Sequence, residues 1–67
     1  MSVSYKPLIS YIERRGISVN TLFELGVITS GAATKLRNDK YVSLDVIDAI
    51  CQHLDIPIEQ VVRISKD

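Results

Sequence analysis

Apolar positions along the chain recur at helical spacing and are separated by short stop signals. In the first such segment, Leu8 and Ile12 are four residues apart and Tyr11 lies beside them. Pro7 precedes them, where the first turn of a helix tolerates proline, and Gly16 follows as an end signal. No stretch of any length shows the alternation of a half-buried strand, so the pattern predicts an all-α fold.

Two short helices are predicted next. The first begins after Ser18, whose hydroxyl can cap it, and ends near Gly26. The second begins after Thr29, another residue suited to capping, and runs to Arg37. Its apolar positions are expected to face the core: Ala33 and Leu36.

A longer helix and a final short one complete the prediction. The longer helix begins after Ser43, carries Asp45 in its first turn and ends before Pro57. Its apolar face comprises Leu44, Val46, Ile47, Ile50, Cys51 and Leu54. A last short helix is expected from Pro57 to about Arg63, with three buried residues: Ile58, Val61 and Val62. The sequence therefore predicts a compact five-helix domain spanning residues 1–67.

Composition excludes several classes of protein. The chain has 67 residues, of which 46% are hydrophobic, which favours one small packed core over disorder. A single cysteine, Cys51, cannot form an intramolecular disulfide, so we expect a cytoplasmic protein. One histidine, His53, and the absence of a Gly-rich phosphate loop argue against an enzyme, a metal site or a cofactor. No small-molecule ligand and no membrane association are expected either.

The net charge of zero hides an uneven distribution. Residues 1–42 hold six basic and three acidic residues, for a net charge of +3, and residues 43–67 hold two basic and five acidic residues, for −3. A difference this small occurs readily by chance and does not by itself imply a nucleic-acid partner. It directs attention to the basic residues between Lys35 and Lys40.

The two middle helices have the length and the short connection of a helix-turn-helix, spanning about residues 18–37. Beyond this spacing, five segments resemble the Xre/Cro-type (lambda-repressor-like) helix-turn-helix regulators of phages and bacteria: LGVIT (25–29), KLRND (35–39), VSLDVI (42–47), ICQHLDI (50–56) and PIEQVV (57–62). The opening SYKPL (4–8) is similar to that of a compact subgroup consisting almost entirely of this domain. The resemblance implies a lambda-repressor-like fold and a double-stranded DNA operator as partner.

The resemblance also implies two groups of DNA-contacting residues. Those expected to approach base edges are Thr29, Ser30, Gly31 and Lys35. Those expected to contact the sugar-phosphate backbone are Asn20, Arg37, Asn38, Lys40 and Tyr41. The reading helix has small residues where the family often has long polar side chains, so methyl contacts and DNA shape are expected to contribute more than base hydrogen bonds.

These features predict a sequence-specific transcriptional repressor that binds a partly palindromic operator as a homodimer. An alternative, from another class of function, is a helix-turn-helix fold reused as a protein-interaction module, such as a phage inhibitor or an antitoxin-like adaptor. Exposure of Phe23, or of residues 56–62 as one apolar patch, would favour this alternative.

Overall fold

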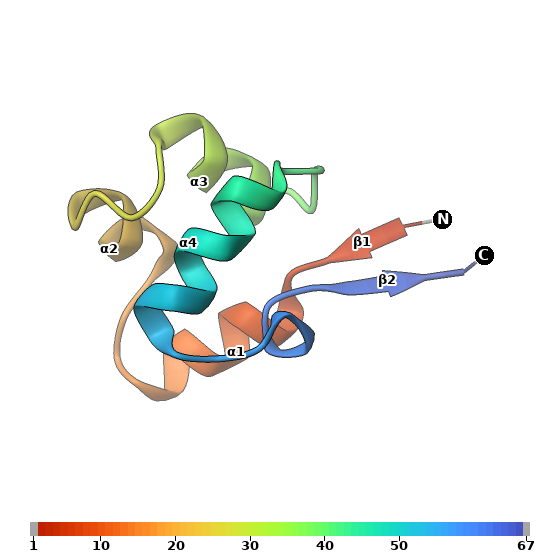
Figure 1. The fold of residues 1–67 in the computed structure, drawn as a ribbon, viewed down its shortest axis with the longest axis horizontal. Helices are drawn as coiled ribbons and strands as arrows, with labels where there is room; N and C mark the ends of the chain where they lie inside the picture. The colour runs from red at the N-terminus through yellow and green to blue at the C-terminus, as the bar shows by residue number, and fades with distance from the viewer. Residues whose placement is uncertain (1, 67) are drawn as a thin grey trace.

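The computed structural model describes residues 2–66, which form four α-helices, one 3₁₀ turn and a two-stranded sheet (Figure 1). The helices are α1 (Lys6–Arg14), α2 (Val19–Glu24), α3 (Ser30–Arg37) and α4 (Leu44–Leu54). The 3₁₀ turn covers Ile58–Gln60, and the strands are β1 (Ser2–Ser4) and β2 (Arg63–Ser65). None of the helices in the described part of the chain is long and apolar enough to span a membrane.

The starts of α2 and α3 follow from their capping residues. The Ser18 hydroxyl accepts a hydrogen bond from the Thr21 N–H at 3.3 Å, and the Thr21 hydroxyl accepts one from the Ser18 N–H at 3.2 Å. The Thr29 hydroxyl accepts from the Ala32 N–H at 3.1 Å. Both caps satisfy backbone donors that a helix start leaves without partners, and they confirm the predicted helix starts. Ser43 precedes α4 as predicted, but its side chain makes no capping hydrogen bond.

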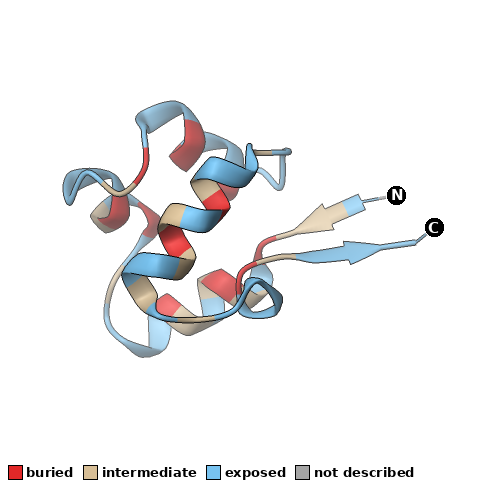
Figure 2. Ribbon diagram, in the orientation of Figure 1, coloured by how far each residue is buried: buried red, intermediate tan, exposed pale blue. Residues whose placement is uncertain are grey.

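Buried side chains from all four helices, together with Tyr5 and Val61 near the two strands, form one core (Figure 2). Its largest fully buried members are Tyr5, Leu8, Ile12, Leu22, Leu36, Ile50 and Val61. The predicted inner faces of the helices are mostly confirmed. Leu44 is an exception: it was expected on the apolar face of α4 but is 75% exposed, because it lies at the first position of the helix, near the edge of the core.

The predicted fifth helix is wrong, and so is the expected burial of Ile58, which is 44% exposed. Val61 is buried as expected, and Val62 is half-buried. After Pro57 the chain makes a single 3₁₀ turn, and β2 then pairs antiparallel with β1, with Val3 opposite Ile64. Several β-branched residues follow the turn, and such side chains favour extended backbone over helix. The fold is therefore mostly helical with a small sheet, rather than all-α.

Candidate nucleic-acid interface

The α2 and α3 helices pack together across a tight turn. Val19 and Leu22 of α2 and Leu36 of α3 are all buried, and so is Ile28 in the turn. Gly26 begins the turn with a φ of +79°, a left-handed conformation that glycine adopts without steric penalty. This packing fixes the orientation of α3 relative to α2.

The α3 helix has one buried face and one exposed face. Ala32, Ala33 and Leu36 are buried in the core. In the view of Figure 1, α3 lies on the other side of α4 from α1, at the edge of the molecule. Its outer face, together with the capping residue before it, presents small and basic side chains to solvent: Thr29, Ser30, Gly31, Thr34 and Lys35.

Two hydroxyl groups on this outer face already form hydrogen bonds within the helix. The Thr29 hydroxyl oxygen accepts from the Ala32 N–H, and the Thr34 hydroxyl donates to the Ser30 carbonyl at 3.1 Å. The Thr34 proton is therefore engaged within α3, whereas Lys35 is exposed in the last turn of the helix. Among these side chains, Lys35 has the longest reach and the only positive charge.

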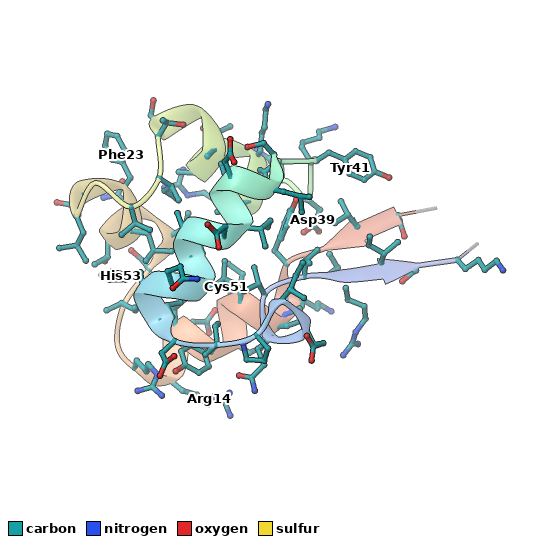
Figure 3. The ribbon with its side chains drawn as sticks, in the orientation of Figure 1. Arg14, Phe23, Asp39, Tyr41, Cys51 and His53 are labelled. Atoms are coloured by element: carbon teal, nitrogen blue, oxygen red, sulfur yellow. The ribbon has the colours of Figure 1, made fainter. Side chains whose placement is uncertain are left out.

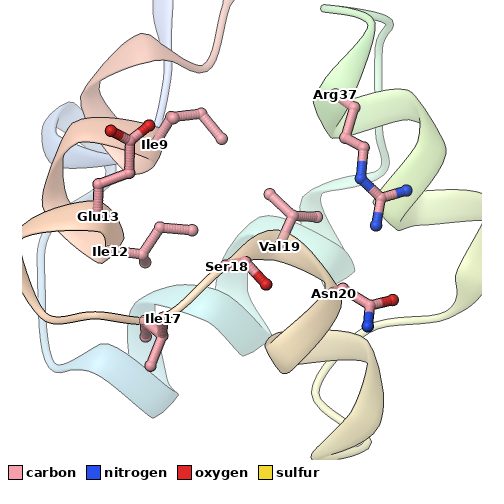
Figure 4. Close-up of a pocket in the computed structure, with 8 residues that line it drawn as sticks. All are labelled: Ile9, Ile12, Glu13, Ile17, Ser18, Val19, Asn20 and Arg37. Carbon is pink, nitrogen blue, oxygen red and sulfur yellow. The ribbon is translucent and has the colours of Figure 1, made fainter.

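Two of the predicted backbone-contacting residues come together at one edge of the α2–α3 pair. Asn20 from α2 and Arg37 from α3 line the same surface hollow of about 250 Å³, with Glu13 of α1 on its opposite wall (Figure 4). The Asn20 amide donates to Glu24 Oε1 at 3.1 Å. This hydrogen bond joins the side chains of two residues one helical turn apart on α2, while Arg37 stays exposed.

The other three predicted backbone-contacting residues follow α3. The Asn38 side-chain amide donates to the Thr34 carbonyl at 2.8 Å, beside the Asn38 backbone N–H, which donates to the same oxygen at 3.2 Å. Lys40 and Tyr41 lie exposed in the loop between α3 and α4, and Tyr41 projects on the side of the molecule from which the strands extend (Figure 3). The residues predicted to contact the sugar-phosphate backbone thus lie on both sides of the outer face of α3.

Tyr5 holds this loop in place, a role that was not predicted from the sequence. Its hydroxyl donates to the Lys40 carbonyl at 2.6 Å, and its backbone N–H donates to Asp39 Oδ1 at 3.1 Å. Asp39 has a φ of +53°, a left-handed conformation that aspartate adopts more readily than most residues. These partners are 34 and 35 residues apart in sequence, so no local pattern could have indicated them.

Acidic side chains are absent from the exposed surface of α3. Residues 27–38 contain two basic residues, Lys35 and Arg37, and no acidic ones. The nearest acidic residues in sequence, Glu24 and Asp39, both accept hydrogen bonds from within the domain. The outer face of α3 is therefore electrostatically compatible with a polyanion.

The single cysteine and the single histidine lie on α4, away from this surface. Cys51 is half-buried, and burial raises the pKa of its thiol, with Asp48 and Glu59 adding to the effect. His53 is exposed in the last turn of α4. Within residues 2–66, no three His, Cys, Asp or Glu side chains come together as a metal site would require.

Residues 8–67 match the family described as the Cro/C1-type HTH DNA-binding domain. The chain belongs to the Cro/C1-type helix-turn-helix family. This match confirms the resemblance seen in the sequence. This Cro/C1-type domain is also similar to the crystal structure of the transcriptional regulator VanUg (form II), with a TM-score of 0.89 and 26% sequence identity over 98% of this chain and 88% of that chain. No curated protein matches the sequence.

Proposed function

We propose that this Cro/C1-type domain is a sequence-specific transcriptional repressor and that α3 enters the major groove of its operator. The observation that carries the proposal is the outer face of α3, which is exposed, free of acidic residues and backed by a buried apolar face. The major groove is about 12 Å wide and admits one α-helix. Membership of a DNA-binding family and similarity to a transcriptional regulator support this assignment.

Sequence readout is assigned to the start and the outer face of α3. Thr29, Ser30 and Gly31 lie at the helix N-terminus, where small side chains let the backbone come close to base edges. Lys35 is proposed to contact guanine, because its ammonium group can donate to the acceptors on the major-groove edge of that base. With few other long side chains on α3, DNA shape supplies much of the remaining specificity.

Affinity is assigned to contacts with the sugar-phosphate backbone on both sides of α3. Arg37 and Lys40 supply positive charge, and Tyr41 supplies a hydroxyl donor. Asn20 and Asn38 already donate hydrogen bonds within the domain, and each amide has a second N–H for a phosphate oxygen. These contacts orient the domain without reading sequence.

The operator is proposed to be partly palindromic and bound by a homodimer, because one domain of this size covers a single half-site. If two protomers together neutralise about six phosphates, the logarithm of the affinity falls with the logarithm of salt concentration with a slope of about −5. Binding that does not respond to salt would contradict the proposed phosphate contacts.

Selection from a random pool of DNA duplexes tests binding, specificity and half-site symmetry together. The selected duplex then serves as the probe for the double variant Lys35→Glu/Arg37→Glu, which is expected to lose binding. Arg14→Glu/Arg15→Glu is the matched control, because it makes the same change in charge at the end of another helix, with Arg14 on the side of the molecule away from α3 (Figure 3). Equal loss of binding in both variants would mean that net charge, not α3, determines the affinity.

The protein-interaction alternative is supported by one feature of α2 and the turn after it. Phe23 and Leu25 are 42% and 60% exposed and lie two residues apart, and an exposed apolar patch can mark a surface for a protein partner. In this alternative, selection from the duplex pool enriches no sequence. Partner binding is then lost in Phe23→Ser and survives in Lys35→Glu/Arg37→Glu.

A further inference from the structure

A surface hollow of about 650 Å³ lies between β1 and the loop after α3. β1 and the first residue of α1 supply one wall, and the loop supplies the other. We call it the strand hollow. Its polar lining residues are Ser2, Ser4, Lys6, Asp39, Lys40 and Tyr41.

Hydrogen bonds fix the strand hollow relative to α3. The Lys40 N–H donates to the Lys35 carbonyl at 2.9 Å, so the loop turns back against the last turn of α3. Tyr5, whose side chain is buried, joins the other wall to this loop through its hydrogen bonds to Asp39 and to the Lys40 carbonyl. Lys6 follows Tyr5 directly, so its backbone has a fixed position relative to the end of α3.

The strand hollow gathers cations and hydrogen-bond donors. Lys6 and Lys40 are both exposed, and the fold brings them to one hollow from distant parts of the sequence. The Ser4 hydroxyl oxygen accepts from the Lys6 N–H at 3.3 Å, which leaves the hydroxyl proton free to donate. Among the described lining residues, Asp39 alone is acidic, and its carboxylate already accepts from the Tyr5 N–H. The strand hollow is therefore suited to an anion.

The pairing of the strands adds a third cation on the same side. Arg63 lies directly opposite Ser4 in the antiparallel pair, and the side chains of opposite residues share one face of the sheet. The next pair along the strands, Val3 and Ile64, faces the other way. Because Ser4 lines the strand hollow, the exposed Arg63 lies on the face of the sheet that borders it.

We propose that the strand hollow binds a phosphate of the DNA backbone outside the stretch of operator that α3 reads, with Lys6 and Arg63 as its cations. This inference rests on the proposed function, in which Lys40 and Tyr41 contact the sugar-phosphate backbone. Each strand of DNA carries a phosphate about every 3.4 Å of helix axis, so a strand that passes Lys40 presents further phosphates to the adjoining hollow. Such a contact adds affinity without reading sequence.

The salt dependence of DNA binding tests the strand hollow. Lys6→Gln removes one charge, so the slope of log affinity against log salt should become less steep by about 0.9 for each bound protomer. Between about 50 and 200 mM salt, the ratio of wild-type to variant affinity should therefore fall about 3.5-fold per protomer. Arg63→Gln is expected to cause the same change from β2.

Arg14→Gln is the matched control. It removes one positive charge from the other end of α1, on the side of the molecule away from α3 (Figure 3). Its salt slope should equal that of the wild type. The proposal is overturned if Lys6→Gln keeps the wild-type slope, or if Arg14→Gln changes the slope as much.

Uncharged phosphate substitutes locate the contact on the DNA. Single phosphates of the selected duplex are replaced by methylphosphonates, one position at a time, and binding of the wild type and Lys6→Gln is measured. At least one position outside the bases that α3 reads should weaken the wild type and leave Lys6→Gln unaffected. If circular dichroism shows that Lys6→Gln is not folded, Arg63→Gln replaces it. A scan in which every sensitive phosphate affects both proteins equally overturns the proposal.

The strand hollow and the proposed regulator can fail separately. Phosphate contacts also act in non-specific binding, so the salt comparison can be made on a duplex of arbitrary sequence. A chain that enriches no sequence, but whose salt slope on that duplex is less steep in Lys6→Gln, keeps the strand hollow and refutes the sequence-specific regulator. A chain that binds its selected duplex with the same slope in the wild type and in Lys6→Gln refutes the strand hollow and leaves the reading role of α3 standing.

Discussion

Replacing Tyr5 with phenylalanine tests how the loop after α3 is held in place. The substitution removes one oxygen and keeps the ring, which is 2% exposed and belongs to the core. The hydroxyl of Tyr5 donates to the Lys40 carbonyl at 2.6 Å, and the variant lacks this donor. The backbone hydrogen bond from Tyr5 to Asp39 is unaffected by the change.

The expected loss follows from the hydrogen bond to the Lys40 carbonyl. An intramolecular hydrogen bond contributes about 0.5–1.5 kcal/mol, and Lys40 lies in an exposed loop where water can reach its carbonyl. We therefore expect Tyr5→Phe to lower the free energy of unfolding by about 1 kcal/mol. For a domain of this size, that loss lowers the melting temperature by about 4–8 °C, which thermal unfolding followed by circular dichroism measures.

The same hydroxyl makes stability depend on pH. Burial raises the pKa of the Tyr5 phenol; a backbone hydrogen bond with Val42 opposes this shift, and Asp39 and Tyr41 reinforce it. The unfolded chain then loses the phenol proton first, near pH 10. The stabilisation is complete below that pH and is lost as the pH rises through the folded-state pKa. The Tyr5→Phe variant has no phenol at this position. The difference in the free energy of unfolding between the wild type and this variant should therefore shrink above about pH 10.

Tyr11→Phe is the control for removing a tyrosine hydroxyl. Tyr11 is half-buried on α1, and its ring, which the variant keeps, lies 4.4 Å from the Arg15 guanidinium. This change should alter the free energy of unfolding by less than about 0.5 kcal/mol. The reasoning would be refuted if Tyr5→Phe were as stable as the wild type, or if Tyr11→Phe lost as much.

Three further results are expected. In urea denaturation, Gly26→Ala should lower the free energy of unfolding by about 1 kcal/mol, because Gly26 has a φ of +79°. A Cβ there would meet no atom within 4 Å, so the loss comes from the backbone conformation and not from a clash. Gly16→Ala, at a φ of +73°, should lose a similar amount, and no loss in either variant would contradict the backbone argument. Gly31→Ala should raise the free energy of unfolding by about 0.4–1 kcal/mol in the same assay, because alanine restricts the unfolded chain and a Cβ at this helical position would meet only the Thr29 hydroxyl at 4.0 Å; a loss would contradict this. The Cys51 thiol should react with a disulfide reagent more slowly in the folded protein than in urea, because burial raises its pKa; equal rates would show that the thiol is accessible.

Local signals account for what the sequence predicted well. Ser18 and Thr29 act on backbone groups three residues away, so the starts of α2 and α3 can be read from short stretches of sequence. Helical periodicity likewise indicated two residues of the buried face of α3, Ala33 and Leu36; Ala32, which was not predicted, is buried as well. The exposure of the predicted DNA-contacting residues on and after α3 follows from the same pattern.

What the sequence missed depends on residues far apart in the chain. Each strand is only three residues long, too short for its alternation to stand out, and β1 exists because β2 lies beside it. The hydrogen bonds from Tyr5 to the loop after α3 span half the chain. Leu44 was misplaced because helical periodicity gives the direction of a side chain around the helix but does not say where the core ends.

The pairing of Ser2 with Ser65 brings the first residue of β1 and the last residue of β2 side by side. Residues opposite one another in an antiparallel pair have Cα atoms about 5 Å apart, a gap that a few glycines bridge. A circularly permuted chain, joined there and opened at another surface loop, would therefore keep the same helices in the same cyclic order. In the present connectivity β1 and β2 hold each other in place, so removing either strand releases the other.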